Sequence, residues 1–128
     1  MLYYANKLLG KGEEMQDRNK VTIEHIESVI VDENYFTAAD GYAGAMACSK
    51  EFSELPDDKR IINPPEELNL LTFCVLTLKN GFAVTGESAC VSPENFDESI
   101  GKKVARENAI EKIWPLEGYL LKDELSKA

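Results

Sequence analysis

The chain has 128 residues, of which 44% are hydrophobic, and its formal net charge is −9. This length supports one hydrophobic core, whereas two domains of half the size would each be too small to fold alone. The acidity disfavours general binding to DNA or RNA, because nucleic-acid affinity comes largely from Lys and Arg side chains that displace counterions. The same charge favours solubility and would steer a basic protein partner towards the chain.

Residues 1–20 are predicted to be an extension ahead of a single α+β domain over 21–128. The segment from Lys11 to Met15 can only be encoded as AAR-GGN-GAR-GAR-ATG, a purine run resembling a bacterial ribosome-binding site ahead of a start codon. On this interpretation Met15 is the natural start, and the miscalled residues before it are disordered or loosely helical. The alternative is a genuine amphipathic helix with an apolar face of Leu2, Ala5, Leu8 and Leu9.

The apolar segments and the cysteines indicate a cytoplasmic protein without a membrane anchor. The longest apolar stretch, Leu70 to Leu78, is interrupted by two threonines and is too short to span a bilayer. The run Leu2–Ala5 is too short for a secretory signal. Cys48, Cys74 and Cys90 show no CxxC spacing, so we expect three free thiols in a reducing compartment.

Between Val21 and Glu67 the pattern predicts one helix, an aromatic segment and a long connection. Thr22 is a suitable N-cap for a helix from about Ile23 to Val31. Residues 32–46 predict a buried aromatic pair, Tyr35 and Phe36, followed by a small-residue loop or short helix. Residues 49–67 are charged and contain three prolines, which predicts an irregular connection.

The strongest local signal is a hairpin over about residues 70–90. Two β-rich runs flank Asn80-Gly81, a dipeptide typical of a two-residue type I′ turn. With that turn, Thr77 pairs with Val84 and Leu76 with Thr85. Both faces of the hairpin carry apolar groups, so we expect it to lie centrally, covered by helices or by another protomer.

A long helix is expected after the hairpin. Ser92-Pro93-Glu94 is a favourable helix start, and Pro115 is expected to end the helix after Trp114. Its apolar stripe is predicted to contain Phe96, Ile100, Val104, Ala105, Ile110 and Ile113. The segment after Gly118 predicts a turn and an apolar tail docked on the domain. The expected fold is therefore α+β: a small antiparallel sheet with a central hairpin, packed against an N-terminal helix and a long C-terminal helix.

The sequence contains no phosphate loop, dinucleotide fingerprint, zinc spacing or serine-hydrolase elbow. The single histidine, His25, is expected on a helix surface between Glu24 and Glu27. We therefore predict no catalytic residues, no metal site and no cofactor.

The speculative ligand-binding residues are grouped around the only basic cluster of the chain. They are Thr85, Glu87, Lys102, Lys103, Arg106 and Trp114. The three cations could hold a phosphate or carboxylate. More commonly, such residues balance neighbouring acids, here Glu98, Glu107 and Glu111, on a solvated, ion-paired face. Trp114 is more typical of a core or interface anchor than of a stacking platform.

Several long segments of the sequence resemble those of a known protein family. They are Leu71–Leu76, Lys79–Phe82, Val84–Cys90, Ser92–Asp97 and most of Gly101–Leu121. Together with an early segment, Val21–Gly41, they resemble a family of short tailed-phage and prophage proteins. That family is known by gene-product numbers and not by an activity, so the resemblance implies a phage origin and carries over no catalytic residues. Residues 1–14 depart from the family pattern, in agreement with a start at Met15.

Three functional hypotheses follow. The first is a non-enzymatic phage or prophage accessory protein that binds a host protein and modulates a host process or defence. The second is a protein that sequesters a nucleotide or similar anion at the six residues named above. The third is a carboxylate-based enzyme, which requires Glu87 buried beside another acid. A homo-oligomer is also expected, because such a small core gains burial by association. Direct binding to nucleic acid or to a membrane is not expected.

Overall fold

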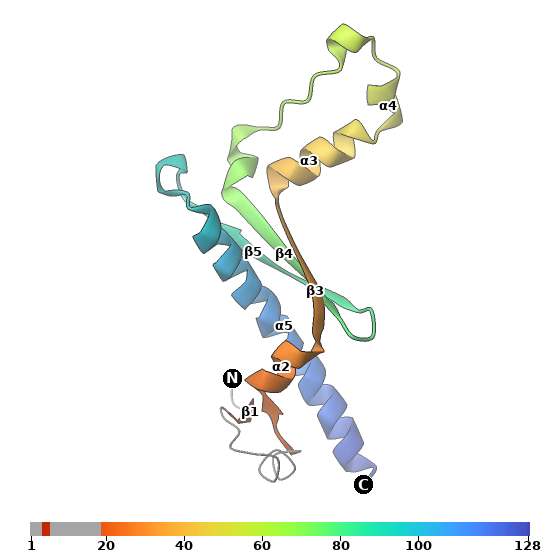
Figure 1. Cartoon of the computed structure of the whole chain (residues 1–128), viewed down its shortest axis with the longest axis vertical. Coiled ribbons are helices and arrows are strands. Elements are labelled where there is room, and N and C mark those ends of the chain that lie inside the picture. The colour runs from red at the N-terminus through yellow and green to blue at the C-terminus, as the bar shows by residue number, and fades with distance from the viewer. Residues whose placement is uncertain (1–3, 6–18) are drawn as a thin grey trace.

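The computed structural model describes residues 4–5 and 19–128. A three-stranded antiparallel sheet lies at its centre, in the order β3-β4-β5, and one long helix crosses one face of that sheet (Figure 1). The strands are β3 (Ile30–Thr37), β4 (Leu71–Leu78) and β5 (Ala83–Ala89), and the helix is α5 (Glu98–Ser126). The predicted α+β fold, with a hairpin inside a small antiparallel sheet between an N-terminal and a long C-terminal helix, is confirmed.

Two short strands precede the first described helix. β1 (Tyr4–Ala5) pairs in parallel with β2 (Val21–Thr22). The predictions for residues 1–20 fall mainly on residues 1–3 and 6–18, which lie outside the described residues. Tyr4 and Ala5 are described, and they form a strand instead of part of an amphipathic helix.

The N-terminal helix α2 (Ile23–Val29) begins where the sequence predicts. The Thr22 hydroxyl accepts a hydrogen bond from the backbone N–H of His25 at 3.1 Å, which caps the helix. The helix ends before the predicted Val31, because Ile30 already belongs to β3. Ile26 and Val29 are buried and attach α2 to the core.

The segment after α2 is an extended strand, so the prediction of a buried aromatic pair is wrong. Side chains alternate along β3, which places Tyr35 opposite Cys74 on the face towards α5 and Phe36 opposite Phe73 on the other face. Tyr35 is partly buried, whereas Phe36 is 39% exposed and stacks at 5.5 Å on the Phe73 ring. The strand itself was missed because its polar residues Asp32, Glu33 and Asn34 hide the alternation.

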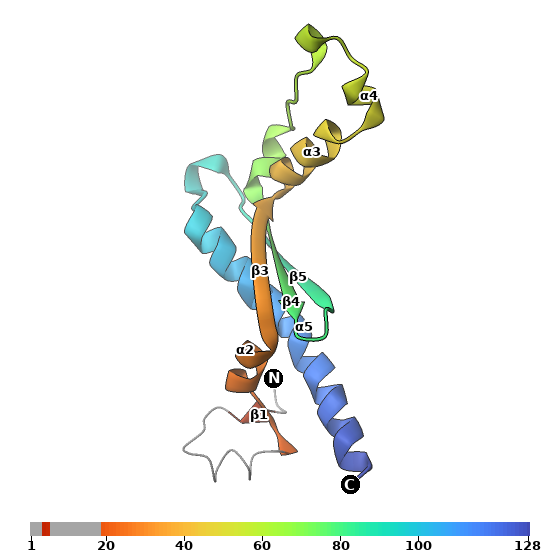
Figure 2. The same ribbon diagram turned by 45° about the vertical axis from the view of Figure 1, so that its right-hand side comes forward.

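A helical arm follows β3 and returns the chain to β4. Of the two predicted alternatives, the short helix is correct: α3 spans Ala38–Ala47. It begins with a capping box in which Thr37 and Asp40 each accept a hydrogen bond from the other's backbone N–H. The rest is largely irregular, as predicted, with α4 (Lys50–Ser53) and 3₁₀ turns at Asp57–Lys59 and Glu66–Leu70. Residues 38–70, here called the arm, project beyond the end of the sheet (Figures 1 and 2).

The hairpin forms as predicted, but its register differs by one residue. Thr77 lies opposite Ala83, and Leu76 lies opposite Val84. At the turn, the Gly81 N–H donates to the Leu78 carbonyl and the Leu78 N–H donates to the Phe82 carbonyl, both at 2.8 Å. The loop therefore has three residues and ends in a glycine with φ +89°, the geometry of a type I turn with a glycine bulge.

The corrected register decides which side of β5 meets the helix. A one-residue change in pairing moves every side chain of the strand to the opposite face. Val84 and Gly86 consequently join Cys74 and Leu76 on the face that α5 covers, whereas Thr85 is exposed. β4 is the central strand, in agreement with a centrally placed hairpin.

Helix α5 packs on the sheet through a row of mostly small residues. Gly101, Ala105, Ala109 and Ile113, spaced four apart, are all buried. A Cβ added to Gly86 would lie 2.1 Å from the Ala105 carbonyl oxygen and 2.2 Å from the Ala109 nitrogen, so β5 approaches the helix backbone directly. The predicted stripe is correct at Ala105 and Ile113 and wrong at Ile100, which is 59% exposed.

Both predicted ends of this helix are wrong. The Ser92-Pro93 segment forms only a 3₁₀ turn, Pro93–Asn95, and Ser92 makes no capping bond. The cap is instead Asp97, whose carboxylate accepts hydrogen bonds from the Ser99 and Ile100 N–H groups. The Ser99 hydroxyl also donates to this carboxylate, and that bond, together with the backbone bonds, lowers the pKa of Asp97. Pro115 lies inside the helix, which continues to Ser126.

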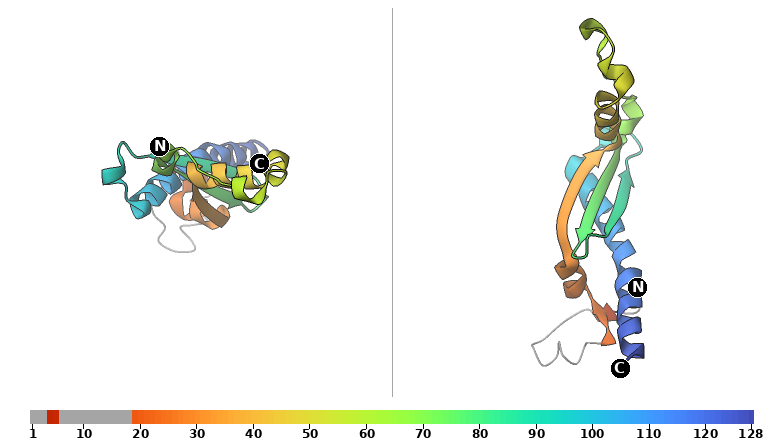
Figure 3. Two further views of the ribbon diagram at one scale, coloured as in Figure 1. Left: turned by 90° about the horizontal axis from the view of Figure 1, so that it is seen from above. Right: turned by 90° about the vertical axis from the view of Figure 1, so that its right-hand side faces the viewer.

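Residues 115–126, here called the tail, extend past the sheet (Figure 3). Proline removes one helical hydrogen bond, but α5 is fixed on both sides of it: Trp114 is buried, and Glu117 pairs with His25 of α2 at 2.6 Å. The predicted turn at Gly118 and docked apolar segment are not found. Leu121 packs partly against the core, whereas Tyr119 and Leu120 are 76% and 50% exposed.

Candidate functional site

Two lysines of the basic cluster form ion pairs along their own helix. Lys102 lies 3.4 Å from Glu98, and Lys103 lies 2.8 Å from Glu107, each four residues apart. Lys102 also lies 5.7 Å from the centre of the Tyr35 ring, a cation–π contact with β3. The ion-paired interpretation of these lysines is therefore confirmed.

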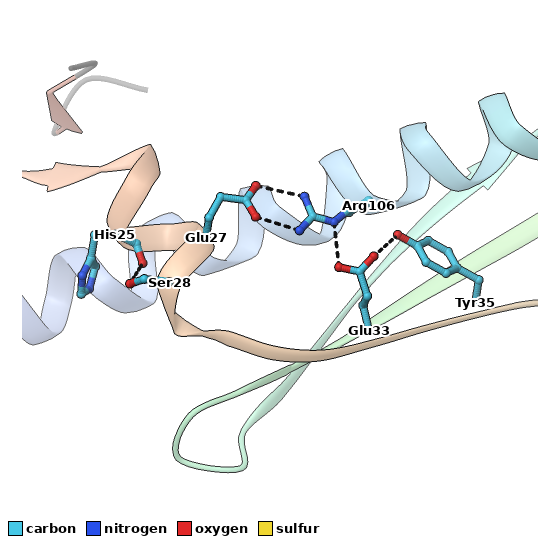
Figure 4. Close-up of polar contacts among 6 residues, drawn as sticks. All are labelled: His25, Glu27, Ser28, Glu33, Tyr35 and Arg106. Carbon is cyan, nitrogen blue, oxygen red and sulfur yellow. Dashed lines mark hydrogen bonds and ion pairs between the residues drawn. The ribbon is translucent and has the colours of Figure 1, made fainter. Parts of the chain in front are cut away.

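Arg106 joins three elements and is the most highly connected cation of the cluster (Figure 4). Its two terminal nitrogens donate to both carboxylate oxygens of Glu27 on α2, at 2.8 and 3.0 Å. Its Nε donates to Glu33 on β3 at 3.2 Å. The hydrogen bonds from Arg106 lower the pKa of Glu27, and those to Glu27 raise the pKa of Arg106.

The Arg106 network continues towards the core through Tyr35. The Tyr35 hydroxyl donates to the second Glu33 oxygen at 2.8 Å (Figure 4). Burial, followed by this hydrogen bond, raises the pKa of Tyr35, and burial also raises the pKa of the neighbouring Cys74 thiol. The tyrosine and the thiol are therefore neutral at physiological pH, and the network orients α2, β3 and α5 relative to one another.

Thr85 and Glu87 lie at the other edge of the sheet, on β5. Lys112 lies 3.3 Å from the Thr85 hydroxyl and 3.8 Å from the Glu87 carboxylate. Asn108 donates to the Glu87 backbone carbonyl at 2.7 Å. The sequence reasoning missed Asn108 and Lys112, although their spacing of four residues on one helix face was a usable signal.

The six predicted ligand-binding residues thus occupy different surroundings. Lys102 and Arg106 contact the β3 side, Thr85 and Glu87 lie on the β5 edge, and Trp114 is 4% exposed in the core. The structure brings the three cations close to carboxylates and does not bring the six residues together at one surface. The anion site stays a prediction, and it would require Arg106 to exchange its present carboxylate partners for a ligand.

Other chemistry is limited in the described part of the chain. The Glu87 side chain is 48% exposed and its ionic partner is Lys112, so the buried acid pair required by the carboxylate-enzyme hypothesis is not formed at this residue.

Among residues 4–5 and 19–128, no group of three or more His, Cys, Asp or Glu side chains could hold a metal ion. Cys48, Cys74 and Cys90 are free thiols, as predicted. No helix of the described residues combines the length and apolarity needed to cross a membrane.

The arm presents a different kind of surface. Tyr42, Leu55 and Ile61 are 37%, 40% and 70% exposed, so large apolar side chains reach the surface on this projecting element. Acidic residues outnumber basic residues around them: Asp40, Glu51, Glu54, Asp57, Asp58, Glu66 and Glu67 stand against Lys50, Lys59 and Arg60. Arg60 is paired with Asp57. Exposed apolar side chains surrounded by polar and charged residues are characteristic of protein-binding surfaces.

Comparison with known protein families gives a match over most of the chain. The model of the phage protein (N4 Gp49/phage Sf6 gene 66) family covers residues 21–125. The searches of curated proteins and of solved structures return no match to the chain.

Proposed function

The chain belongs to the phage protein (N4 Gp49/phage Sf6 gene 66) family, and on that premise we propose that it is a non-enzymatic accessory protein that binds a host protein. It acts in the cytoplasm of the host cell and modulates a host process or defence. The observation that carries the proposal is the arm, which combines exposed apolar side chains with an excess of acids on an element held away from the sheet.

The charge of the arm suggests the chemistry of the partner. A surface with more carboxylates than cations attracts a basic surface and increases the rate of encounter. Many basic surfaces in cells normally grip nucleic acid, and an acidic protein competes for them without binding nucleic acid itself. Tyr42, Leu55 and Ile61 would supply the apolar contacts that hold the complex after encounter.

The cations of α5 support this assignment over the anion-binding alternative. Lys103 and Arg106 already have carboxylate partners at 3.2 Å or less. An anionic ligand would have to displace those partners and leave the released carboxylates beside a new negative charge. The cost of that exchange favours a protein partner at the arm over an anion at α5.

The proposal can be tested by comparing three forms of the protein as bait in a lysate of the bacterial host. The arm variant combines Leu55→Asp with Ile61→Asp. The matched control is Val91→Asp, which changes a 97% exposed apolar residue outside the arm. We expect a basic host protein to be retained by the wild type and the control, to be lost with the arm variant, and to bind more weakly as salt increases.

Equal retention by all three forms, or no specific retention at low and moderate salt, would contradict the proposal. Thermal denaturation in the presence of nucleotides tests the alternative, because a ligand that binds the folded state must raise the melting temperature. A rise that persists in the arm variant and disappears in Arg106→Met would favour the anion-binding function.

A further inference from the structure

Strand β3 lies at an edge of the sheet and has an open outer side. It pairs with β4 alone, and the right-hand view of Figure 3 shows no further strand or helix beside it among the described residues. The backbone groups of an edge strand point alternately towards its neighbour and away from it. On β4, the Leu78 N–H bonds to Phe82 on the β5 side, so the odd-numbered residues of β4 face β3. Their partners are Asp32, Asn34 and Phe36, and the backbone groups of the residues between these three therefore point outward.

The outward backbone groups of β3 are free in its middle. The cap of α3 already uses the Thr37 N–H, which agrees with an outward direction. The hydrogen bonds of the described residues leave the backbone N–H and C=O of Glu33 and Tyr35 unused. At the opposite edge, Asn108 donates to the Glu87 carbonyl of β5 at 2.7 Å and so occupies an outward group there. β3 is therefore the better edge for a further strand.

The side chains next to this edge indicate what it would bind. Asp32 is exposed, and no described Lys, Arg or His side chain forms an ion pair with it. Its carboxylate accepts a hydrogen bond from the Asn34 side chain at 3.1 Å, which orients it. Phe36 lies on the same face and is 39% exposed. A strand beside β3 would place one side chain next to the unpaired carboxylate and another, four residues away, next to the Phe36 ring.

A second copy of the chain fits this edge poorly. Its own β3 would bring Asp32 and Glu33 to the contact again, and each copy carries −9. β3 also has a bulge between Ile30 and Asp32 and an inward-pointing charge at Glu33. Both features are ways in which edge strands resist pairing with one another. The charge instead complements a basic segment.

We propose that the outer edge of β3 binds an extended segment of a basic protein, which adds a fourth, antiparallel strand to the sheet. Backbone hydrogen bonds to Glu33 and Tyr35 hold the segment. A lysine or arginine beside Asp32 and an apolar side chain beside Phe36 select its sequence. The inference rests on the proposed function for its basic host protein and assigns that protein a second contact, next to the base of the arm.

Binding of a synthetic peptide to the full chain, measured by fluorescence anisotropy, tests this proposal. The probe is a labelled octapeptide of threonines in which a valine precedes a lysine by four residues. Antiparallel pairing then puts the valine beside Phe36 and the lysine beside Asp32. We expect a dissociation constant of about 10–500 μM, and binding at least about threefold weaker when glutamate replaces the lysine. No binding of the lysine peptide up to about 1 mM would overturn the proposal.

Backbone methylation of the peptide tests the added strand without changing the protein. The two threonines opposite Glu33 and Tyr35 direct their N–H groups towards β3, whereas the valine and the lysine direct theirs away. N-methylation of those threonines should abolish binding, and N-methylation of the valine and the lysine should preserve it. The bound peptide should also slow hydrogen exchange at the Glu33 and Tyr35 amides. Equal binding of both methylated peptides would contradict strand addition.

Two variants of the chain connect the preference for lysine to one carboxylate. Asp32→Asn should bind the lysine and glutamate peptides almost equally, because the charge is removed and the shape is kept. The matched control Asp58→Asn removes an exposed acid of the arm and should keep the wild-type preference. An unchanged preference in Asp32→Asn would refute the assigned site.

The arm variant separates this proposal from the proposed function. Leu55→Asp/Ile61→Asp should bind the lysine peptide as the wild type does, because neither residue lies on β3. Retention of a host protein through the arm, with no peptide bound by the wild type, would leave the proposed function standing and refute the additional strand. A peptide of residues 30–37 tests a second copy as the occupant, and tighter binding of that peptide than of the lysine peptide would also refute the proposal.

Discussion

The tight packing of Gly86 against helix α5 makes a sharp prediction. We expect Gly86→Ala to destabilise the protein strongly, because the added methyl group would meet the Ala105 oxygen at 2.1 Å and the Ala109 nitrogen at 2.2 Å. Ordinary contact begins at 3.4 Å, so the helix and the strand would have to separate by about 1.3 Å. Both obstacles are backbone atoms in the middle of α5, and neither can rotate away.

The size of the effect follows from what that separation disturbs. A gap of about 0.5–1 Å already removes a quarter to a half of the dispersion attraction between packed atoms. The affected contact is the one that holds α5 on the sheet and buries Ala105, Ala109 and Ile113. Overpacking normally costs about 1–3 kcal/mol, and we expect a loss at the upper end, about 3 kcal/mol. For a domain of this size that corresponds to a fall in melting temperature of about 12 °C.

Urea denaturation followed by circular dichroism measures this loss directly. The matched control is Gly44→Ala in α3, where an added Cβ has no atom within 4 Å. Alanine favours a helix over glycine by up to about 1 kcal/mol, so the control should be neutral or stabilised. If the free energy of unfolding of Gly86→Ala lies within about 0.5 kcal/mol of the wild-type value, the close approach of β5 to the α5 backbone is wrong.

Four further predictions concern the network, the turn and the tail. Arg106→Met should reduce the free energy of unfolding by about 1–2 kcal/mol, a value discounted for the partial exposure of its ion pairs. Because Arg106 lowers the pKa of Glu27, wild-type stability should be full above the ordinary pKa of that carboxyl and decline as the pH falls below it. Denaturation curves between about pH 7 and pH 3 should show a smaller decline in Arg106→Met than in the wild type. Gly81→Ala, at φ +89°, should cost about 1 kcal/mol in the same assay, and an unchanged value would contradict the turn geometry. Pro115→Ala should restore a helical hydrogen bond, increase helicity by circular dichroism and slow hydrogen exchange in the tail, whereas faster exchange would show that proline is needed there.

The hairpin shows how far local sequence determines this fold. Asn80-Gly81 between two β-rich runs correctly predicts the strands and their antiparallel pairing. It does not decide between a two-residue and a three-residue loop, because glycine accepts the positive φ of either turn. The register is set by packing at a distance: only with Gly86 facing α5 can the helix approach β5 so closely. That information lies in residues 101–113, not in the turn.

Helix α5 shows the limits of local signals for the ends of elements. Ser92-Pro93 resembles a helix start, but Asp97 provides the actual cap with bonds to two N–H groups. Pro115 normally ends a helix, yet the chain remains helical because Trp114 before it and Glu117 after it have partners elsewhere in the molecule. Such tertiary contacts outweigh the local preference.

The difference between local and long-range contacts also affects which surface of the protein is a candidate binding site. Pairs four residues apart on one helix, such as Lys103 with Glu107, can be read from the sequence, whereas Arg106 with Glu27 and Glu33 cannot. The long-range pairs matter more, because they engage Arg106, the arginine of the predicted cluster, and use it to join α2, β3 and α5. What they leave available includes the arm, where acids outnumber bases and Tyr42, Leu55 and Ile61 are exposed. Anion recognition would therefore have to compete with the contacts that hold the fold together, whereas binding of a basic protein at the arm would not.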